Sequence, residues 1–212
     1  KGGIYTTGNH EQYAGPGAGG DYENQRNSNP TAKRLIQSGV AASTEDYVVY
    51  CFGASNDGSS RLVQEFTEQQ IEQLESFLNS ENANSNIPVF IMSHYPLHYN
   101  GNRIVERSEE VIAILNEHPN VFFLWGHNHS DVGDMEVGYD NILKAGDTIT
   151  TLNNENGTPS TKQIQFTYTA AGCMSDGEYY SSSAAVLGKG IVAEITDIAG
   201  QKQVSLTYYN LD

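Results

Sequence analysis

Two continuous apolar runs, IPVFIMS at 87–93 and VFFLW at 121–125, limit the folds that this 212-residue chain can adopt. An apolar run of about four to eight residues without alternation is typical of a strand covered on both faces. Strands of this kind occur mainly in parallel sheets, where a crossover helix joins each strand to the next. The two runs therefore favour an α/β fold over an all-helical or an all-β fold.

Two amphipathic segments supply the helices that such a sheet needs. FTEQQIEQLESFLN at 66–79 places apolar residues on one helical face, and Thr67 and Gln70 have the spacing of a capping box. A second helix is expected over roughly 106–117, with Pro119 just beyond its end. Both helices fall next to the apolar runs in the sequence, as expected of crossover connections.

Further strands are expected outside this central part of the chain. GIYTT at 3–7 and YVVYCF at 47–52 have the β-branched and aromatic composition of strands. After residue 160, the runs IQFTYTAA, GIVAEIT and QVSLTYY alternate in character with no helix of useful length between them, so antiparallel strands are expected. We interpret residues 1–212 as a single domain.

The charge balance argues against two classes of partner. Acidic residues outnumber basic ones 26 to 11, and the formal net charge is −15. A surface of this sign repels nucleic acid backbones and anionic membranes, so neither is expected as a partner. No apolar run approaches the about 20 residues that a membrane helix needs, which predicts a soluble protein.

Cysteine usage leaves two possibilities open. Cys51 and Cys173 show no metal-type spacing, so they are either buried thiols or the two halves of one disulfide. Scarce lysine together with abundant Asn, Ser, Thr and Tyr is the composition of an exported protein. An extracellular or cell-surface location is therefore the expectation.

Histidines gather directly after three of the predicted strands. GNHE (8–11) follows GIYTT, SHYPLHY (93–99) follows IPVFIM, and GHNHS (126–130) follows VFFLW, and these clusters hold five of the six histidines. In open α/β sheets, ligands bind at the carboxyl ends of the strands. Because imidazole is a common metal ligand, three clusters at this edge indicate a metal site rather than surface histidines.

The spacing within the last cluster bears on how many ions are bound. His127 and His129 flank Asn128, so in an extended segment both side chains point the same way, whereas a turn allowed by Gly126 sends them to two neighbouring ions. A paired-metal site polarises a phosphoryl oxygen and holds a bridging hydroxide as nucleophile. A single-zinc hydrolase is disfavoured because no Glu or Asp is spaced as its general base.

The ordered clusters GNHE, SHYP and GHNH resemble the last three motif blocks of the calcineurin-like metallophosphoesterase family. The resemblance covers residues 1 to about 130 closely and the remainder in outline. It implies an α/β fold in which a two-sheet sandwich is flanked by helices. It also implies hydrolysis of phosphomonoesters or phosphodiesters by a hydroxide bound to a dinuclear metal centre, with two divalent transition metal ions (Mn, Fe or Zn) and a small-molecule phosphoester substrate.

The resemblance also assigns roles to individual residues. Asn9, His94 and His127 would bind one metal ion and His129 the other. His10 would meet the substrate phosphate or protonate the leaving oxygen, with Glu11, where the family often has Asp, orienting its imidazole. Substrate contacts are expected from Asn9, His10, His98 and Tyr99, and a structural role on the surface is the alternative for His98.

One departure from the family pattern concerns the start of the chain. The family's first two blocks, Asp-x-His and Gly-Asp-x-x-Asp, precede GNHE, but only seven residues precede it here. The expectation is an N-terminally truncated domain that lacks its first two strands, with a separate proteolytic piece or a metal-poor relative as alternatives. The corresponding alternative function is a truncated or degenerate non-catalytic domain that binds metal weakly or associates with a missing N-terminal half. An exposed sheet edge would then favour a homodimer.

Overall fold

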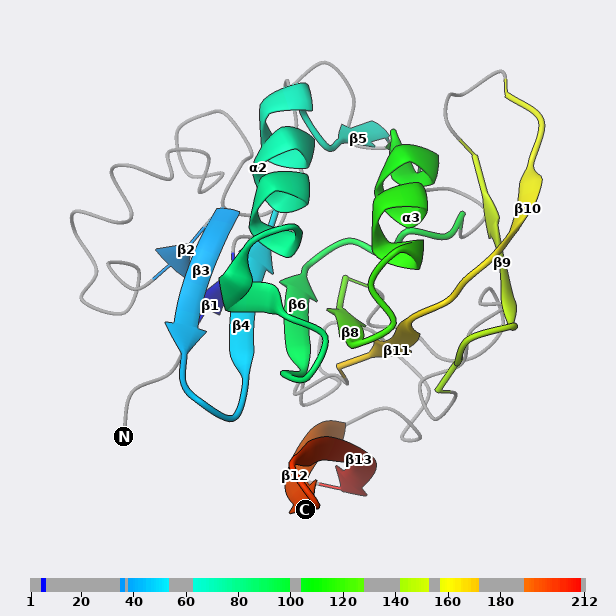
Figure 1. Cartoon of the computed structure of the whole chain (residues 1–212). Coiled ribbons are helices and arrows are strands. Elements are labelled where there is room, and N and C mark those ends of the chain that lie inside the picture. Colours follow the sequence, from blue (N-terminus) through cyan, green and yellow to red (C-terminus); the bar gives the residue numbers. More distant parts are fainter. Residues whose placement is uncertain are drawn as a thin grey trace.

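The computed structural model describes residues 5–6, 35–36, 38–53, 63–99, 104–127, 142–152, 157–171 and 189–210. Its centre is a five-stranded sheet with the order β11-β8-β6-β4-β3 (Figure 1). The strands are β3 (Ser38–Ser43), β4 (Val48–Phe52), β6 (Val89–Ser93), β8 (Val121–Trp125) and β11 (Thr167–Ala170). Strands β4, β6, β8 and β11 are parallel, and β3 pairs antiparallel with β4 at one edge. The predicted α/β class is confirmed, with both apolar runs in the middle of the sheet.

Two helices lie side by side against one face of this sheet (Figure 1). Helix α2 (Glu68–Leu78) begins with the predicted capping box, because the Thr67 hydroxyl accepts a hydrogen bond from Gln70 N and Gln70 Oε1 accepts one from Thr67 N. A short 3-10 helix, η2 (Glu81–Ala83), follows it, and α3 (Ser108–Asn116) precedes β8. Each helix connects two parallel strands, as a crossover does.

The hydrophobic core lies between the two helices and the sheet. Alternate residues of the strands face the helices, and the ring of Tyr50 on β4 stacks on that of Phe77 on α2 at a centroid distance of 4.6 Å. Fully or almost fully buried members include Tyr50, Phe52, Leu74, Leu78, Val89, Ile91, Val111, Leu115, Val121, Phe123, Trp125 and Tyr168. The core therefore reaches Trp125, the last residue of β8.

Smaller sheets surround this centre. Two are parallel pairs, β1 (Tyr5–Thr6) with β2 (Leu35–Ile36) and β5 (Val63–Glu65) with β7 (Ile104–Glu106). Two are antiparallel pairs, β9 (Thr148–Thr151) with β10 (Ser160–Gln163) and β12 (Lys189–Ile198) with β13 (Gln201–Asn210). Neither helix in the described ranges is long and apolar enough to cross a membrane.

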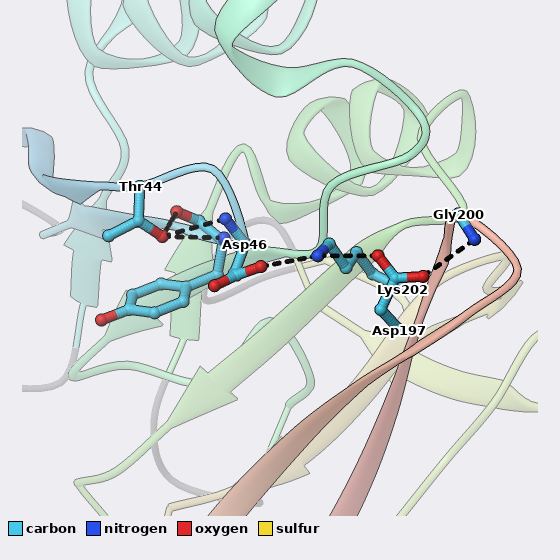
Figure 2. A network of polar contacts seen from close by, with 6 residues as sticks. Thr44, Asp46, Asp197, Gly200 and Lys202 are labelled. Carbon is cyan, nitrogen blue, oxygen red and sulfur yellow. Dashed lines mark hydrogen bonds and ion pairs between the residues drawn. The ribbon is translucent and has the colours of Figure 1, made fainter.

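The β12–β13 hairpin is attached to the central sheet at two points. Near its turn, Lys202 Nζ lies 2.6 Å from Asp46 Oδ1, in the connection between β3 and β4, and 3.0 Å from Asp197 Oδ2 (Figure 2). Near its open end, the Tyr208 hydroxyl donates to the carbonyl of Ala170 at 2.9 Å and also contacts the hydroxyl of Thr169. Thr169 alternates along β11 with the core residue Tyr168, so this contact is on the face opposite the helices.

Two details differ from the sequence expectations. The first of the three C-terminal runs was expected to be antiparallel, but β11 pairs parallel with β8 at the edge of the central sheet. The chain between β8 and β11 is long and includes the β9–β10 hairpin, which gives it the length that a parallel pairing requires. The second helix begins at Ser108 rather than 106, because Ile104–Glu106 forms a strand with β5.

Candidate metal centre

Two of the predicted metal ligands meet at the carboxyl edge of the sheet. Ser93 and Trp125 are register partners at the ends of β6 and β8, and each is followed by a segment that carries a histidine. Gly126 N donates a hydrogen bond to His94 O at 3.2 Å, which ties the two segments together just beyond the strands. As a result, His94 Nε2 lies 3.0 Å from His127 Nδ1. The convergence of strand ends expected from the sequence is thus present for this pair.

The backbone of His127, two residues after β8, has an uncommon conformation. Its φ is +74°, in the left-handed region, and the turn that was expected between His127 and His129 lies outside the described residues. A Cβ added at Gly126 would meet its nearest atom, His94 O, at an ordinary 3.7 Å. A left-handed conformation costs a non-glycine residue roughly 1–2 kcal/mol, and such strain concentrates at functional sites. The chain therefore carries a strained backbone at the residue that presents its imidazole to His94.

The separation of the two nitrogens suits a shared cation. Two nitrogens that each lie about 2.1 Å from one ion are about 3.4 Å apart at the tetrahedral angle and about 3.0 Å apart at 90°, and 3.0 Å is also the distance of the hydrogen bond that the two rings make here. Within the described residues there is no group of three or more His, Cys, Asp or Glu side chains that could hold a metal. Asn9, His10, Glu11 and His129 lie outside the described residues. Within the described residues, His94 and His127 therefore supply two of the ligands that a metal site needs, and not a complete set.

Tyr95 forms a buried wall beside both imidazoles. Its exposed fraction is 0%, and its ring centroid lies 5.0 Å from that of His94 and 4.9 Å from that of His127. A rigid aromatic surface in contact with two rings restricts the rotamers that either ring can adopt. Adjacency to His94 was the only signal in the sequence, and no spacing rule pointed to this role.

His98 and Tyr99, expected as substrate contacts, lie further along the same segment. His98 is 1% exposed, its ring packs edge-on against Trp125, and its Nδ1 is 2.7 Å from the Tyr168 hydroxyl. Burial lowers the pKa of His98 to about 4, so the ring is neutral at pH 7. A substrate contact would require this ring to leave its pocket. Tyr99 is half-buried, and its backbone N–H donates to Thr150 O at 2.7 Å.

The cysteine near this edge is inert at neutral pH. Cys51 on β4 is a free, fully buried thiol, and burial raises its pKa to about 11, with the Thr6 side chain acting in the opposite direction. A thiol with a raised pKa is a poor nucleophile and a poor metal ligand, because both roles need the thiolate. Cys173 lies outside the described residues.

One of the comparisons with known proteins gave a match. The family model described as calcineurin-like phosphoesterase matches residues 2–131, a range that includes β6, β8 and the His94–His127 pair. Searches of curated proteins and of solved structures gave no match. The matched range is more than half of the 212 residues. The chain belongs to the calcineurin-like phosphoesterase family.

Proposed function

We propose that this protein is a metal-dependent phosphoesterase that hydrolyses phosphomonoesters or phosphodiesters at the carboxyl edge of its central sheet. The observation that carries the proposal is the 3.0 Å approach of His94 Nε2 to His127 Nδ1, from two neighbouring parallel strands. Family membership supports metal-dependent phosphoester hydrolysis in general. The pair supports it for these particular residues, because two imidazoles whose ring nitrogens lie 3.0 Å apart can bind one ion with a small adjustment of their side chains.

In this proposal the complete centre holds two divalent transition metal ions, Mn, Fe or Zn. The ligands of one ion include Asn9, His94 and His127, and those of the other include His129. When bound, the ions supply the positive charge that polarises a phosphoryl oxygen and activates water. This charge matters because the chain has a formal net charge of −15, so its own side chains offer little attraction for an anionic ester.

The proton chemistry is assigned to the chain itself. His10 holds a proton on its ring close to the leaving oxygen and transfers it as the ester bond breaks, and Glu11 orients that ring. Asn9, His10 and Tyr99 contact the substrate. The β12–β13 hairpin, on the face of the sheet opposite the helices, belongs in this proposal to the second sheet of a sandwich.

A phosphoesterase assay with matched histidine variants tests this function. The protein is loaded with Mn²⁺ or Zn²⁺ and assayed with an aryl phosphomonoester and an aryl phosphodiester. We expect His94→Ala to lower kcat/KM by more than about 100-fold, beyond the 10–100-fold typical of groups outside the ligand set. His118→Gln is the control, since His118 is half-buried beyond the end of α3 and should leave activity unchanged. Equal activity of His94→Ala and the unmodified protein would refute the proposal.

A further inference from the structure

The hydroxyl of Tyr168 is the meeting point of three contacts from the segment that carries His94. Leu97 N lies 2.8 Å from this oxygen, His98 N lies 3.4 Å from it, and His98 Nδ1 lies 2.7 Å from it. Tyr168 is on β11, about 70 residues further along the chain, so these contacts tie the segment after β6 to the far edge of the sheet. We call this set of contacts the Tyr168 latch.

Donor and acceptor counting fixes the direction of each hydrogen bond in the latch. A tyrosine hydroxyl has one proton and two acceptor positions, and both backbone N–H groups can only donate. The two acceptor positions are therefore used by Leu97 N and His98 N, which leaves the hydroxyl proton for His98 Nδ1. His98 must then be the neutral tautomer with its proton on Nε2.

Burial reinforces this arrangement. Tyr168 is 0% exposed and His98 is 1% exposed. Burial raises the pKa of Tyr168 and lowers that of His98 to about 4, so the hydroxyl keeps its proton and the imidazole stays unprotonated at Nδ1 near neutral pH. Leaving a buried donor or acceptor without its partner costs more free energy than an ordinary hydrogen bond contributes to stability. Breaking the contacts of the latch is therefore unfavourable.

The latch is connected to both members of the histidine pair. Tyr168 stacks on Trp125 at a centroid distance of 6.0 Å, and His98 packs edge-on against the same indole at 4.9 Å. Trp125 is the last residue of β8, directly before Gly126 and His127, and its carbonyl accepts from Ala171 N at 2.7 Å. On the other side, His94 O accepts from Gly126 N. The segment 94–98 is thus fixed at both of its ends.

We propose that His98 and Tyr168 are positioning residues, which hold the 94–98 segment so that His94 Nε2 faces His127 Nδ1 in the geometry that metal binding requires. The inference rests on the proposed function, because it concerns affinity for the metal at the same site. In this inference His98 positions the backbone of residues 94–98 and does not contact the substrate. Neither residue touches the ion, and both act through the backbone that presents His94.

Two matched tyrosine variants test the latch. Tyr168→Phe removes the hydroxyl that makes the latch, and Tyr50→Phe removes another tyrosine hydroxyl of the same sheet, which lies 3.5 Å from Ser38 Oγ in a part-buried contact and is remote from the histidines. Each variant is titrated with Co²⁺, and the Kd is read from the visible absorption of the ion. We expect Tyr168→Phe to raise the Kd by about 10-fold and Tyr50→Phe to leave it within about twofold. Equal Kd values for two folded variants would overturn the proposal.

A second pair of variants covers the case in which Tyr168→Phe does not fold. Asparagine places an acceptor near the position of Nδ1, so His98→Asn should keep the Kd for Co²⁺ within about threefold. His98→Leu cannot accept from Tyr168 and should raise the Kd by about 10-fold. If Tyr168→Phe folds, combining it with His98→Leu should add little, because both changes break the same contact. A His98→Leu protein with the original affinity would contradict the proposal.

Amide hydrogen exchange separates failure of the latch from failure of the metal site. Exchange at Leu97 and Gly126 should become faster in Tyr168→Phe than in Tyr50→Phe, without any metal present. If the protein does not bind Co²⁺, or if the His94→Ala variant binds it as tightly, the proposed function is wrong. The exchange rates still test the latch in that case, because they are measured without metal. Unchanged exchange at Gly126 in both His98→Leu and Tyr168→Phe would overturn the positioning role.

Discussion

The middle of the central sheet and the β12–β13 hairpin both contain apolar strand residues, but they are stabilised differently. Val89 on β6 and Phe123 on β8 are 0% exposed beneath the helices. On the hairpin, Val192 is 44% exposed and Ile198 is 51% exposed. The sheet is held by apolar burial, whereas the ion pair of Lys202 and the hydrogen bond of Tyr208 attach the hairpin near its two ends.

This difference teaches that composition alone does not set how much a strand contributes to stability. An apolar residue stabilises roughly in proportion to the area that a neighbouring layer removes from water. The sheet has α2 and α3 against its core face, while the inward residues of the hairpin, such as Val204 and Leu206, are only half-buried. We therefore expect the sheet to determine global unfolding and the hairpin to open more easily.

The largest effect is expected from a cavity in the sheet. Phe123→Ala should lower the free energy of unfolding by roughly 3–5 kcal/mol, because Phe123 is fully buried and stacks on Tyr168. Val192→Ala on the hairpin should change it by no more than about 0.5 kcal/mol. Urea unfolding followed by the fluorescence of Trp125, the single tryptophan, measures both. Similar losses in the two variants would remove the distinction between the regions.

Acid should weaken the sheet and the hairpin in different pH ranges. The folded pKa of His98, about 4, is below the ordinary 6.5, so the unfolded chain binds the extra proton. The stability linked to His98 is therefore complete above about pH 6.5 and is lost as the pH falls towards 4, by up to about 3 kcal/mol. Hydrogen bonding to Lys202 lowers the pKa of Asp197 from 3.8, so the hairpin loses that contribution only at lower pH.

His98→Asn provides the control for this pH dependence. The slope of the unfolding free energy against pH is proportional to the number of protons that the chain takes up on unfolding. Because asparagine does not titrate, the variant should take up as much as one proton less between pH 6.5 and 4. Urea unfolding at several pH values gives this slope. An identical slope in the variant would show that His98 is not responsible for the acid sensitivity.

The smallest effect is expected where the hairpin meets β11. Tyr208→Phe removes the hydrogen bond to Ala170 O and should cost about 1 kcal/mol, seen mainly as faster amide exchange in β12 and β13. Tyr209→Phe is a close control, since Tyr209 is the next residue, points to the other face and is 47% exposed. If both variants exchange alike, the hydroxyl of Tyr208 does not anchor the hairpin.

The elements that sequence patterns predicted well are those governed by local rules. The capping box of Thr67 and Gln70 involves residues three positions apart, and the apolar runs at 87–93 and 121–125 needed no knowledge of their neighbours. The approach of His94 to His127 followed from one general rule, that parallel strands end at the same edge. Short-range chemistry and sheet geometry were sufficient in these cases.

The features that could not be predicted depend on contacts distant in sequence. The parallel pairing of β11 with β8 was decided by a long connection, and the alternating pattern of IQFTYTAA did not reveal it. The burial of His98 depends on Tyr168, about 70 residues away, so the spacing of SHYPLHY gave no indication of it. Amino-acid type likewise gave no indication that His127, rather than the neighbouring Gly126, has a positive φ.

The left-handed backbone at His127 has a consequence for how this position can change during evolution. Residues branched at Cβ are strongly disfavoured there, whereas glycine and asparagine are tolerated. A lineage that abandoned its metal would thus be expected to substitute one of those two, and seldom valine or isoleucine. Glycine or asparagine at this position in a relative would therefore indicate a lost metal ligand, because the positive φ is retained after the histidine has been replaced.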